Sequence, residues 1–211
     1  IITSLVRIEG KPFGLMANNT FHLAGAIDSD GADKASRFVQ LCDAFDIPML
    51  VLIDTPGFMV GPEAEKTAQV RHFGRIFLNA ANVDIPIFSI VLRRGYGLGA
   101  MAMAGGSFHN SDFIVSWPTG EFGGMGLEGA VRLGFKKELE AIEDPEEREA
   151  KFEELLGFLY ERGKGVNMAA CLEIDDVIDP AETRRWIMCG LCSQPEPPLR
   201  TTKKRPNIDG W

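Results

Sequence analysis

The residues in this sequence that could do chemistry lie in two glycine-rich turns, one at residues 95–106 and one at 120–129. In the first turn, Gly97-Leu98-Gly99-Ala100-Met101-Ala102 fits the relaxed dinucleotide-binding pattern G-x-G-x-x-[GA]. However, Gly105-Gly106 cuts the following helix short, and Trp117-Pro118 stands where an acidic residue should bind the ribose. A better use of these glycines is to expose backbone N–H groups at a helix start, where they can hold a developing oxyanion. Tight packing of a helix against a strand is the alternative explanation.

A further candidate motif, Asp54-Thr55-Pro56-Gly57, follows an apolar run. It resembles the magnesium-side motif of GTPases, but the sequence contains no phosphate-binding string of the form G-x-x-x-x-G-K-[ST]. What remains is a Pro-Gly turn at the carboxyl end of a strand, which is where ligands bind in open α/β sheets.

Metal-ligating and nucleophilic groups are sparse. The three histidines, His22, His72 and His109, are far apart, and none lies in an H-E-x-x-H pattern. Cys189 and Cys192 have C-x-x-C spacing, but they lack a second pair for zinc and follow a helix instead of opening one. We therefore expect no metal site and no Ser-His-Asp set. The sequence favours a chemistry that depends on backbone amides and on a base carried by the substrate.

Strands that alternate with helices place these turns in an α/β fold with a largely parallel sheet. The segments 4–8 and 13–17 flank a turn and predict a hairpin. Two short apolar runs predict buried strands, at 47–53 and 85–92, and a third short strand is expected at 112–117. Helical spacing predicts helices at 33–46, 65–81 and 181–192. Asp33 and Asp179 are the expected N-caps of the first and the last of these helices.

The last third of the chain has a different character. Residues 136–164 hold ten acidic and six basic residues together with an apolar stripe, which indicates a long surface helix. From residue 194 the chain is rich in proline, which favours an extended tail. We therefore expect a single domain over residues 1–193, including the acidic helical segment 136–164, and a tail over residues 194–211.

Composition excludes several classes of function. The 211 residues include 22 basic and 30 acidic side chains, and a net charge of −8 disfavours binding to nucleic acids or to anionic membranes. No apolar run approaches the roughly 18–20 residues of a membrane span. Four cysteines are too few for a disulfide scaffold, so we expect a reducing, cytoplasmic setting. The first residue is not Met, from which we expect a piece of a longer chain.

An ordered series of short segments resembles the C-terminal half of the carboxyltransferase subunit (β type) of biotin-dependent acyl-CoA carboxylases, the acetyl- and propionyl-CoA carboxylase family. The resemblance covers most of residues 5–133 and continues more loosely to the end. No single segment is decisive, but their order is specific. The segments are Gly14-Leu15-Met16-Ala17-Asn18, Lys34-Ala35-Ser36-Arg37-Phe38, Cys42-Asp43-Ala44-Phe45-Asp46-Ile47-Pro48, Asp54-Thr55-Pro56-Gly57-Phe58, Leu92-Arg93-Arg94-Gly95-Tyr96-Gly97, Trp117-Pro118-Thr119 and Met125-Gly126-Leu127-Glu128-Gly129-Ala130-Val131.

The resemblance implies a crotonase-like (ClpP/crotonase) fold, in which ββα units wind into a superhelix. Family subunits contain an N-terminal domain that chiefly holds the acyl-CoA and a C-terminal domain that holds carboxybiotin. The active site lies between domains of different subunits. This chain would then be the biotin side of the site and inactive alone. Its implied partners are the missing N-terminal domain, a biotin carrier or biotin carboxylase subunit that delivers carboxybiotin, and further copies in a homo-oligomer, a hexamer when full length.

The resemblance also implies roles for individual residues in carboxyl transfer from carboxybiotin to the α-carbon of an acyl-CoA. The backbone amides of Leu98 and Gly99 would form the oxyanion hole. Met101 would line the acyl pocket. The biotin pocket would be lined by Gly57, Phe58, Gly61, Tyr96 and Gly97.

The chain departs from the family pattern at one place that matters for this assignment. Many relatives have Tyr-Gly-Gly-Ala-Tyr where this chain has Tyr96-Gly97-Leu98-Gly99-Ala100. Donation by backbone amides tolerates the difference, because the amides remain. The sequence leaves open the acyl group, the full oligomer, and the roles of segment 136–164 and of Cys189 and Cys192. It also leaves open a biotin-dependent acyl-CoA decarboxylase and an inactive carrier-binding or dimerisation fragment.

Overall fold

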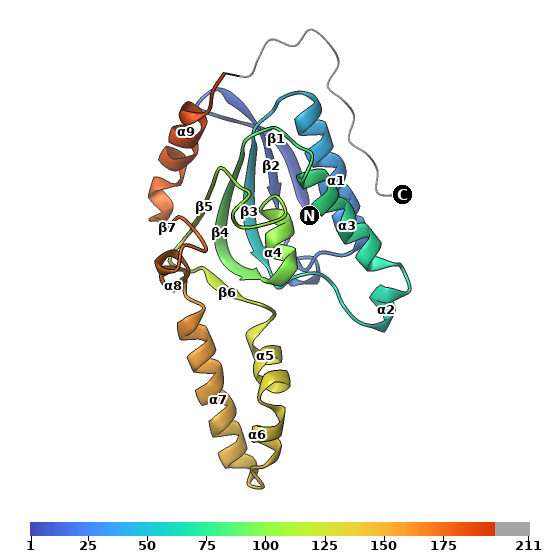
Figure 1. Ribbon diagram of the computed structural model, residues 1–211, viewed down its shortest axis with the longest axis vertical. Coiled ribbons are helices and arrows are strands. Elements are labelled where there is room, and N and C mark those ends of the chain that lie inside the picture. The colour runs from blue at the N-terminus through green and yellow to red at the C-terminus, as the bar shows by residue number, and fades with distance from the viewer. Residues whose placement is uncertain (197–211) are drawn as a thin grey trace.

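A seven-stranded sheet forms the centre of the computed structural model, which describes residues 1–196 (Figure 1). The strand order is β1-β2-β3-β4-β5-β7, and β6 pairs with β4 beyond the end of β5. All pairs are parallel except β1 with β2. The strands are β1 (Ile2–Ile8), β2 (Lys11–Ala17), β3 (Met49–Thr55), β4 (Ile87–Tyr96), β5 (Phe113–Ser116), β6 (Glu121–Gly123) and β7 (Asp176–Val177). The predicted hairpin and the three further predicted strands are confirmed.

The hairpin that opens the chain depends on two residues with positive φ. Glu9 and Gly10 connect β1 to β2 with φ of 49° and 81°. A two-residue turn with both φ positive matches the right-handed twist of the flanking strands. This turn fixes the pairing of Ile8 with Lys11 and therefore the register of the whole hairpin.

Helices cover both faces of the sheet (Figure 1). One face packs against α1 (Ser29–Ala44), α3 (Gln69–Ala80) and α4 (Gly97–Met103). The other face packs against α9 (Thr183–Ser193), which follows the short 3₁₀ helix η2 (Pro180–Glu182). Side chains along β3 and β4 alternate between the two cores: Val51 and Ile53 face α1 and α3, whereas Leu50 and Ile90 face the α9 side.

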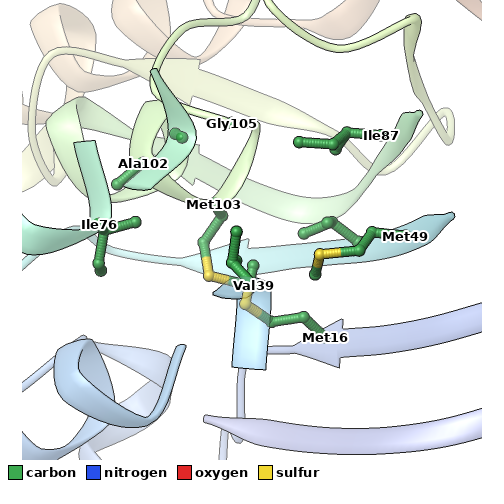
Figure 2. Close-up of a pocket in the computed structure, with 10 residues that line it drawn as sticks. Met16, Val39, Met49, Ile76, Ile87, Ala102, Met103 and Gly105 are labelled. Carbon is green, nitrogen blue, oxygen red and sulfur yellow. The ribbon is translucent and has the colours of Figure 1, made fainter. Parts of the chain in front are cut away.

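The core beneath α4 is rich in methionine. Met103 at the end of α4 meets Met16 of β2 around Val39 of α1, with Met49 of β3 alongside (Figure 2). These side chains surround a void of about 10 Å³, which is lined by apolar atoms. A void this small without polar partners does not hold an ordered water. The end of α4 therefore rests on an apolar base.

A helical arm extends away from the sheet (Figure 1). It consists of α5 (Leu127–Gly134), α6 (Lys136–Glu140) and α7 (Pro145–Arg162), and α8 (Gly165–Ala170) follows it. Its core includes Leu127, Val131, Phe152 and Leu156 together with Tyr96 of β4. The single long helix predicted for 136–164 is therefore wrong in part. Asp144 caps α7 and Pro145 opens it, so the acidic segment is split into two helices.

Two helix boundaries also differ from prediction. Helix α1 begins earlier than expected, because Asp28 rather than Asp33 is the N-cap: the Asp28 carboxylate accepts a hydrogen bond from the Gly31 amide at 2.8 Å. Asp33 instead pairs with the Arg75 guanidinium at 3.0 Å. The helix predicted at 65–81 begins later, as α3 at Gln69, since Ala68 before it has a φ of 54°, and the separate short helix α2 (Pro62–Glu65) precedes it. The expected N-cap Asp179 is confirmed, although it caps η2, which leads into α9.

Residues 197–211 lie outside the described residues, and so does most of the predicted tail at 194–211. Within residues 1–196, no helix combines the length and hydropathy needed to cross a membrane.

Helix α9 lies so close to the sheet that a glycine is needed at the contact. A Cβ at Gly190 would lie 2.7 Å from Phe113 Cε1 and 3.0 Å from Phe88 Cε1. Both rings are held by their neighbours, because Phe113 stacks on Phe88 and meets the edge of Trp186. We predict that Gly190→Ala lowers the free energy of unfolding by about 1–3 kcal/mol, as overpacking does.

The matched control for this variant is Gly157→Ala on the exposed face of α7, where an added Cβ meets nothing within 4 Å. Replacing a mid-helix glycine by alanine should stabilise the protein by about 0.5–1 kcal/mol. Urea denaturation followed by tryptophan fluorescence measures both changes. Equal effects of the two variants would contradict the tight contact at Gly190.

Candidate active site

Three glycine-containing turns converge at the carboxyl ends of β3, β4 and β6. A Cβ at Gly99 would lie 2.7 Å from Gly57 Cα, and a Cβ at Gly97 would lie 2.7 Å from the Gly124 carbonyl oxygen. Only glycine permits backbones to approach this closely. The structure therefore brings together Gly57, Gly97 and Gly99, three of the residues predicted to form the site.

The start of α4 leaves backbone donors without helical acceptors. Helix α4 begins at Gly97, so the amides of Leu98 and Gly99 lie in its first turn, where N–H groups have no partner within the helix. The Leu98 side chain is 62% exposed, whereas Gly99 is buried against Gly57 and the Phe58 amide. Tight packing thus explains the glycines, and the same packing places two first-turn amides beside the turn after β3.

The Asp54-Thr55-Pro56-Gly57 motif builds that turn through its side chains. The buried Thr55 hydroxyl accepts a hydrogen bond from the Gly57 amide and donates one to the Gly57 carbonyl, both at 3.1 Å. The Asp54 amide donates to the Asn18 side chain at 3.1 Å. These bonds, together with a Gly57 φ of 119°, fix the turn in the shape that Gly99 packs against.

Asp54 also joins the turn to β4. Between the pairs Ile53–Val91 and Thr55–Gly95 the register shifts, so that three residues of β4 oppose Asp54 alone. The Asp54 carboxylate fills this bulge and accepts hydrogen bonds from Arg93 Nη2 at 2.9 Å and from Arg94 Nε at 3.1 Å. The bulge is therefore held by two ion pairs.

Arg94 extends this arrangement to the loop before α1. Its Nη2 donates to the Ala24 carbonyl at 2.6 Å, within the short 3₁₀ helix η1 (Leu23–Gly25). Partial burial of Asp54 acts to raise its pKa, but the hydrogen bonds from Arg93 and Arg94 outweigh that effect and hold the pKa below its usual range.

Two predicted biotin-pocket side chains lie elsewhere. The Phe58 ring stacks on Phe73 with centroids 3.6 Å apart, so it belongs to the core under α3, and only its backbone meets Gly99. Tyr96 is buried, and its hydroxyl donates to Glu121 Oε2 at 2.9 Å. Burial, reinforced by the Glu121 carboxylate, raises the pKa of Tyr96 well above its usual value.

Gly61 takes part in a different element of the structure. It precedes α2 with a φ of 115°, and a Cβ placed there would meet nothing within 4 Å. The structure therefore brings Gly57, Gly97, Gly99 and the backbones of Phe58 and Tyr96 to one place. Gly61 makes no comparably close contact with them.

An apolar cleft of about 450 Å³ opens beside the start of α4. Gly97 and Met101 line it from α4, and the second glycine-rich turn lines it with Gly123 and Gly124. Sequence reasoning missed the other lining residues, because they come from separate elements that only the fold brings together. The apolar stripe predicted in segment 136–164 was the one available signal, since Leu159 belongs to it. The other lining side chains include Phe108, Phe122, Leu127, Ala130, Leu159 and Met168.

Side chains that bind metals do not gather anywhere in residues 1–196, which contain no group of three or more His, Cys, Asp and Glu residues able to hold an ion. Burial raises the pKa of the Cys42 thiol to about 11, so this cysteine is protonated at neutral pH. Cys189 and Cys192 are free and exposed.

Comparison with known proteins decides the family. The family model for the carboxyl transferase domain matches residues 1–208. The chain belongs to the carboxyl transferase domain family. The domain is 35% identical over 194 residues to the methylmalonyl-CoA carboxyltransferase 12S subunit of Propionibacterium freudenreichii subsp. shermanii, covering 90% of this chain and 36% of that protein. It is 34% identical over 188 residues to the methylmalonyl-CoA decarboxylase subunit alpha of Propionigenium modestum, covering 89% of this chain and 36% of the relative.

A solved structure supports the same assignment. The domain matches a single-chain, multi-domain long-chain acyl-CoA carboxylase with a TM-score of 0.80 and 56% identity, covering 89% of this chain and 18% of that one. The crotonase-like fold expected from the resemblance is confirmed. The domain spans only about a third of the length of the two curated relatives described above.

The stability of the carboxyl transferase domain should depend on the charge of Asp54. We predict that Asp54→Asn lowers the free energy of unfolding at pH 7 by about 1–3 kcal/mol, because it removes charge-assisted hydrogen bonds to partly exposed arginines. A carboxyl whose pKa is lowered by folding stabilises the protein above its unfolded pKa, near 4, and loses that effect as the pH falls through the folded pKa. The difference between wild type and variant should therefore shrink below about pH 4.

Chemical denaturation between pH 7 and pH 3 measures this difference. Glu153→Gln, on the exposed face of α7, is the control and should change stability little at any pH. A difference between wild type and Asp54→Asn that stays constant across the range would show that the ion pairs do not brace the turn.

Proposed function

We propose that this domain forms the biotin side of an active site that transfers a carboxyl group from carboxybiotin to the α-carbon of an acyl-CoA. The observation that carries the proposal is the convergence of the turns after β3, β4 and β6 around the first-turn amides of Leu98 and Gly99. Gly97 and Met101 of the same helix line an apolar cleft. Membership of the carboxyl transferase family supports this reaction class.

The residues present fit a biotin group. Its ureido ring is neutral, flat and rich in hydrogen-bonding atoms, so it needs backbone donors at close range and no charged side chain. The Gly57 turn and the start of α4 offer such a surface, because the missing Cβ of Gly99 lets the two backbones lie in direct contact. Gly57, Gly97 and the backbones of Phe58 and Tyr96 would hold the group. When bound, carboxybiotin supplies the carboxyl group as CO2.

The amides of Leu98 and Gly99 would stabilise negative charge on an oxygen during the reaction. Donors that are fixed before the reaction cost no reorganisation, and a single donor of this kind contributes about 2.7–4 kcal/mol. Two contacts hold α4 in place. Its end packs on the methionine-rich core through Ala102 and Met103 (Figure 2). Near its start, Gly99 lies directly against Gly57. In this proposal the side chains of the turn position the donors and do not themselves react.

For the substrate we propose an acyl-CoA with a long chain. The 56% identical structure belongs to a long-chain acyl-CoA carboxylase, and the cleft beside α4 is lined mainly by apolar side chains. The isolated domain would be inactive, because the acyl-CoA side of the site would come from the N-terminal domain. A biotin carrier or biotin carboxylase subunit would deliver carboxybiotin, and several copies would assemble into a homo-oligomer in the cytoplasm.

A biotin-dependent acyl-CoA decarboxylase is the second candidate, since the decarboxylase subunit of Propionigenium modestum is 34% identical to this chain. The same half-site would then work in reverse. A single half-site catalyses both directions, so the net reaction of the complete enzyme distinguishes the two: a carboxylase consumes bicarbonate and ATP to carboxylate the acyl-CoA, whereas a decarboxylase releases CO2 from a carboxylated acyl-CoA without ATP. If the complete enzyme turns over in neither direction, the remaining hypothesis is that the chain is a carrier-binding or dimerisation fragment.

The proposed oxyanion hole can be tested by removing one amide. We predict that Leu98→Pro in the complete enzyme lowers the transfer rate about a hundredfold or more, the cost of losing one donor. Leu98 suits this test because its side chain is exposed, whereas any Cβ at Gly99 would collide with Gly57. Proline is tolerated in the first turn of a helix.

Leu98→Ala is the control, because it trims the side chain but keeps the amide, and it should retain near-normal transfer. The thermal midpoint of both variants shows whether the fold persists. Full activity of a folded Leu98→Pro enzyme would remove the Leu98 amide from the mechanism.

We propose that Met101 lines the acyl pocket and helps to set chain length. It lies one turn after the donors and lines the cleft. Met101→Ala should enlarge the pocket and favour longer chains several-fold, because each buried methylene contributes at most about 0.8 kcal/mol. The ratio of long-chain to short-chain kcat/KM in the complete enzyme measures this shift. A lower stability with an unchanged ratio would make Met101 a core residue only.

A further inference from the structure

The cleft beside α4 has a second wall that belongs to the helical arm. Met101 and Gly97 line the cleft from the body of the domain, whereas Ala130 of α5 and Leu159 of α7 line it from the arm. All of them bound one space of about 450 Å³, which lies in the size range of ligand pockets. The arm is thus part of the cleft and not only a surface extension.

The arm wall is held firmly against the sheet. The Phe122 amide of β6 donates to the Gly163 carbonyl at 2.8 Å, directly after α7. A Cβ at Gly163 would collide with the Phe122 carbonyl oxygen, so the two backbones are in close contact. Nearby, the Tyr160 hydroxyl donates to Glu128 Oε1 of α5 at 3.1 Å. These contacts fix the position of Leu159 relative to β6.

The lining of the cleft suits an alkyl chain. Its apolar side chains include two methionines, Met101 and Met168, whose flexible thioethers adapt to chains of different shape. The charged lining residues are the exposed Arg162 and the partly exposed Glu173. A chain that enters from the side of Gly97 would pass between Met101 and the arm.

Resting on the proposed function, we propose that the arm determines acyl-chain length through Ala130 and Leu159. Ala130 is small, and this leaves room on the arm side that a larger residue would fill. Leu159 is half-buried with its side chain in the wall, whereas the adjacent Phe158 is 56% exposed. The length of chain accepted is then set by the distance between the body and the arm.

The test uses the complete enzyme with acetyl-CoA and palmitoyl-CoA. Ala130→Leu should lower kcat/KM for palmitoyl-CoA at least tenfold relative to acetyl-CoA, because the added side chain occupies the cleft. Leu159→Ala should raise the ratio of palmitoyl-CoA to acetyl-CoA several-fold, because it widens the cleft. Phe158→Ala on the same helix is the matched control and should leave the ratio unchanged.

Equilibrium binding of palmitoyl-CoA to each variant gives a readout that does not depend on turnover. Ala130→Leu should weaken this binding relative to acetyl-CoA, and Leu159→Ala should leave it equal or stronger. The role of the arm would be overturned if neither variant changed the kcat/KM ratio or the affinity for palmitoyl-CoA. This conclusion requires that both variants keep the thermal midpoint of the wild type. If the variants leave both readouts unchanged but still transfer the carboxyl group, only the role of the arm is contradicted. If the variants change the binding of palmitoyl-CoA as expected but the complete enzyme transfers no carboxyl group in either direction, only the proposed function is contradicted.

Discussion

The site depends on one backbone contact, in which the start of α4 lies directly against the turn after β3. Gly99 approaches Gly57 so closely that a single carbon atom added to Gly99 would have to displace the main chain of that turn. Main-chain atoms of a packed turn cannot move aside by changing rotamer. This contact therefore fixes the position of the start of α4 relative to the turn after β3. The first-turn amides of α4 gain their position from this contact and need no side chain to orient them. The rest of the domain serves to keep these two backbones in contact.

Two kinds of interaction do so from opposite sides. Below α4, a dry core of methionine and aliphatic side chains supports the helix, and the void left there is too small and too apolar for water. Beside it, Asp54 fills the bulge in β4 and ties the turn to Arg93 and Arg94. The apolar contacts are non-directional, while the ion pairs act only in one geometry. Together they give the turn both stability and a defined shape, and Arg94 transmits that shape to the loop before α1 through the Ala24 carbonyl.

Much of this arrangement could be predicted from local sequence, and the failures share a cause. The buried strands and the hairpin follow from short apolar runs and a turn with glycine, which are local signals. Asp33 was predicted as the N-cap because its actual partner, Arg75, is distant in sequence. The observed cap, Asp28, lies before the first residue of the apolar helical pattern. The stacking of the Phe58 ring on Phe73 of α3 is a contact that local sequence does not report. The cleft joins residues from α4, β6, α5 and α7, and no local pattern reports such a juxtaposition.

In a site built from main-chain donors, hydrogen-bond donation does not depend on the side chains that determine selectivity. Since the amide of Leu98 is present whatever side chain the residue carries, the exposed side chain at this position can vary without loss of the proposed donor. Selectivity must then reside in the walls around the donors and not in the donors. In this domain one wall is Met101, held by the same short helix, and the other belongs to an arm anchored to β6 through Gly163 and Phe122. Because the two walls are supported by different parts of the chain, the width of the cleft can change without moving the amides that the proposed reaction requires.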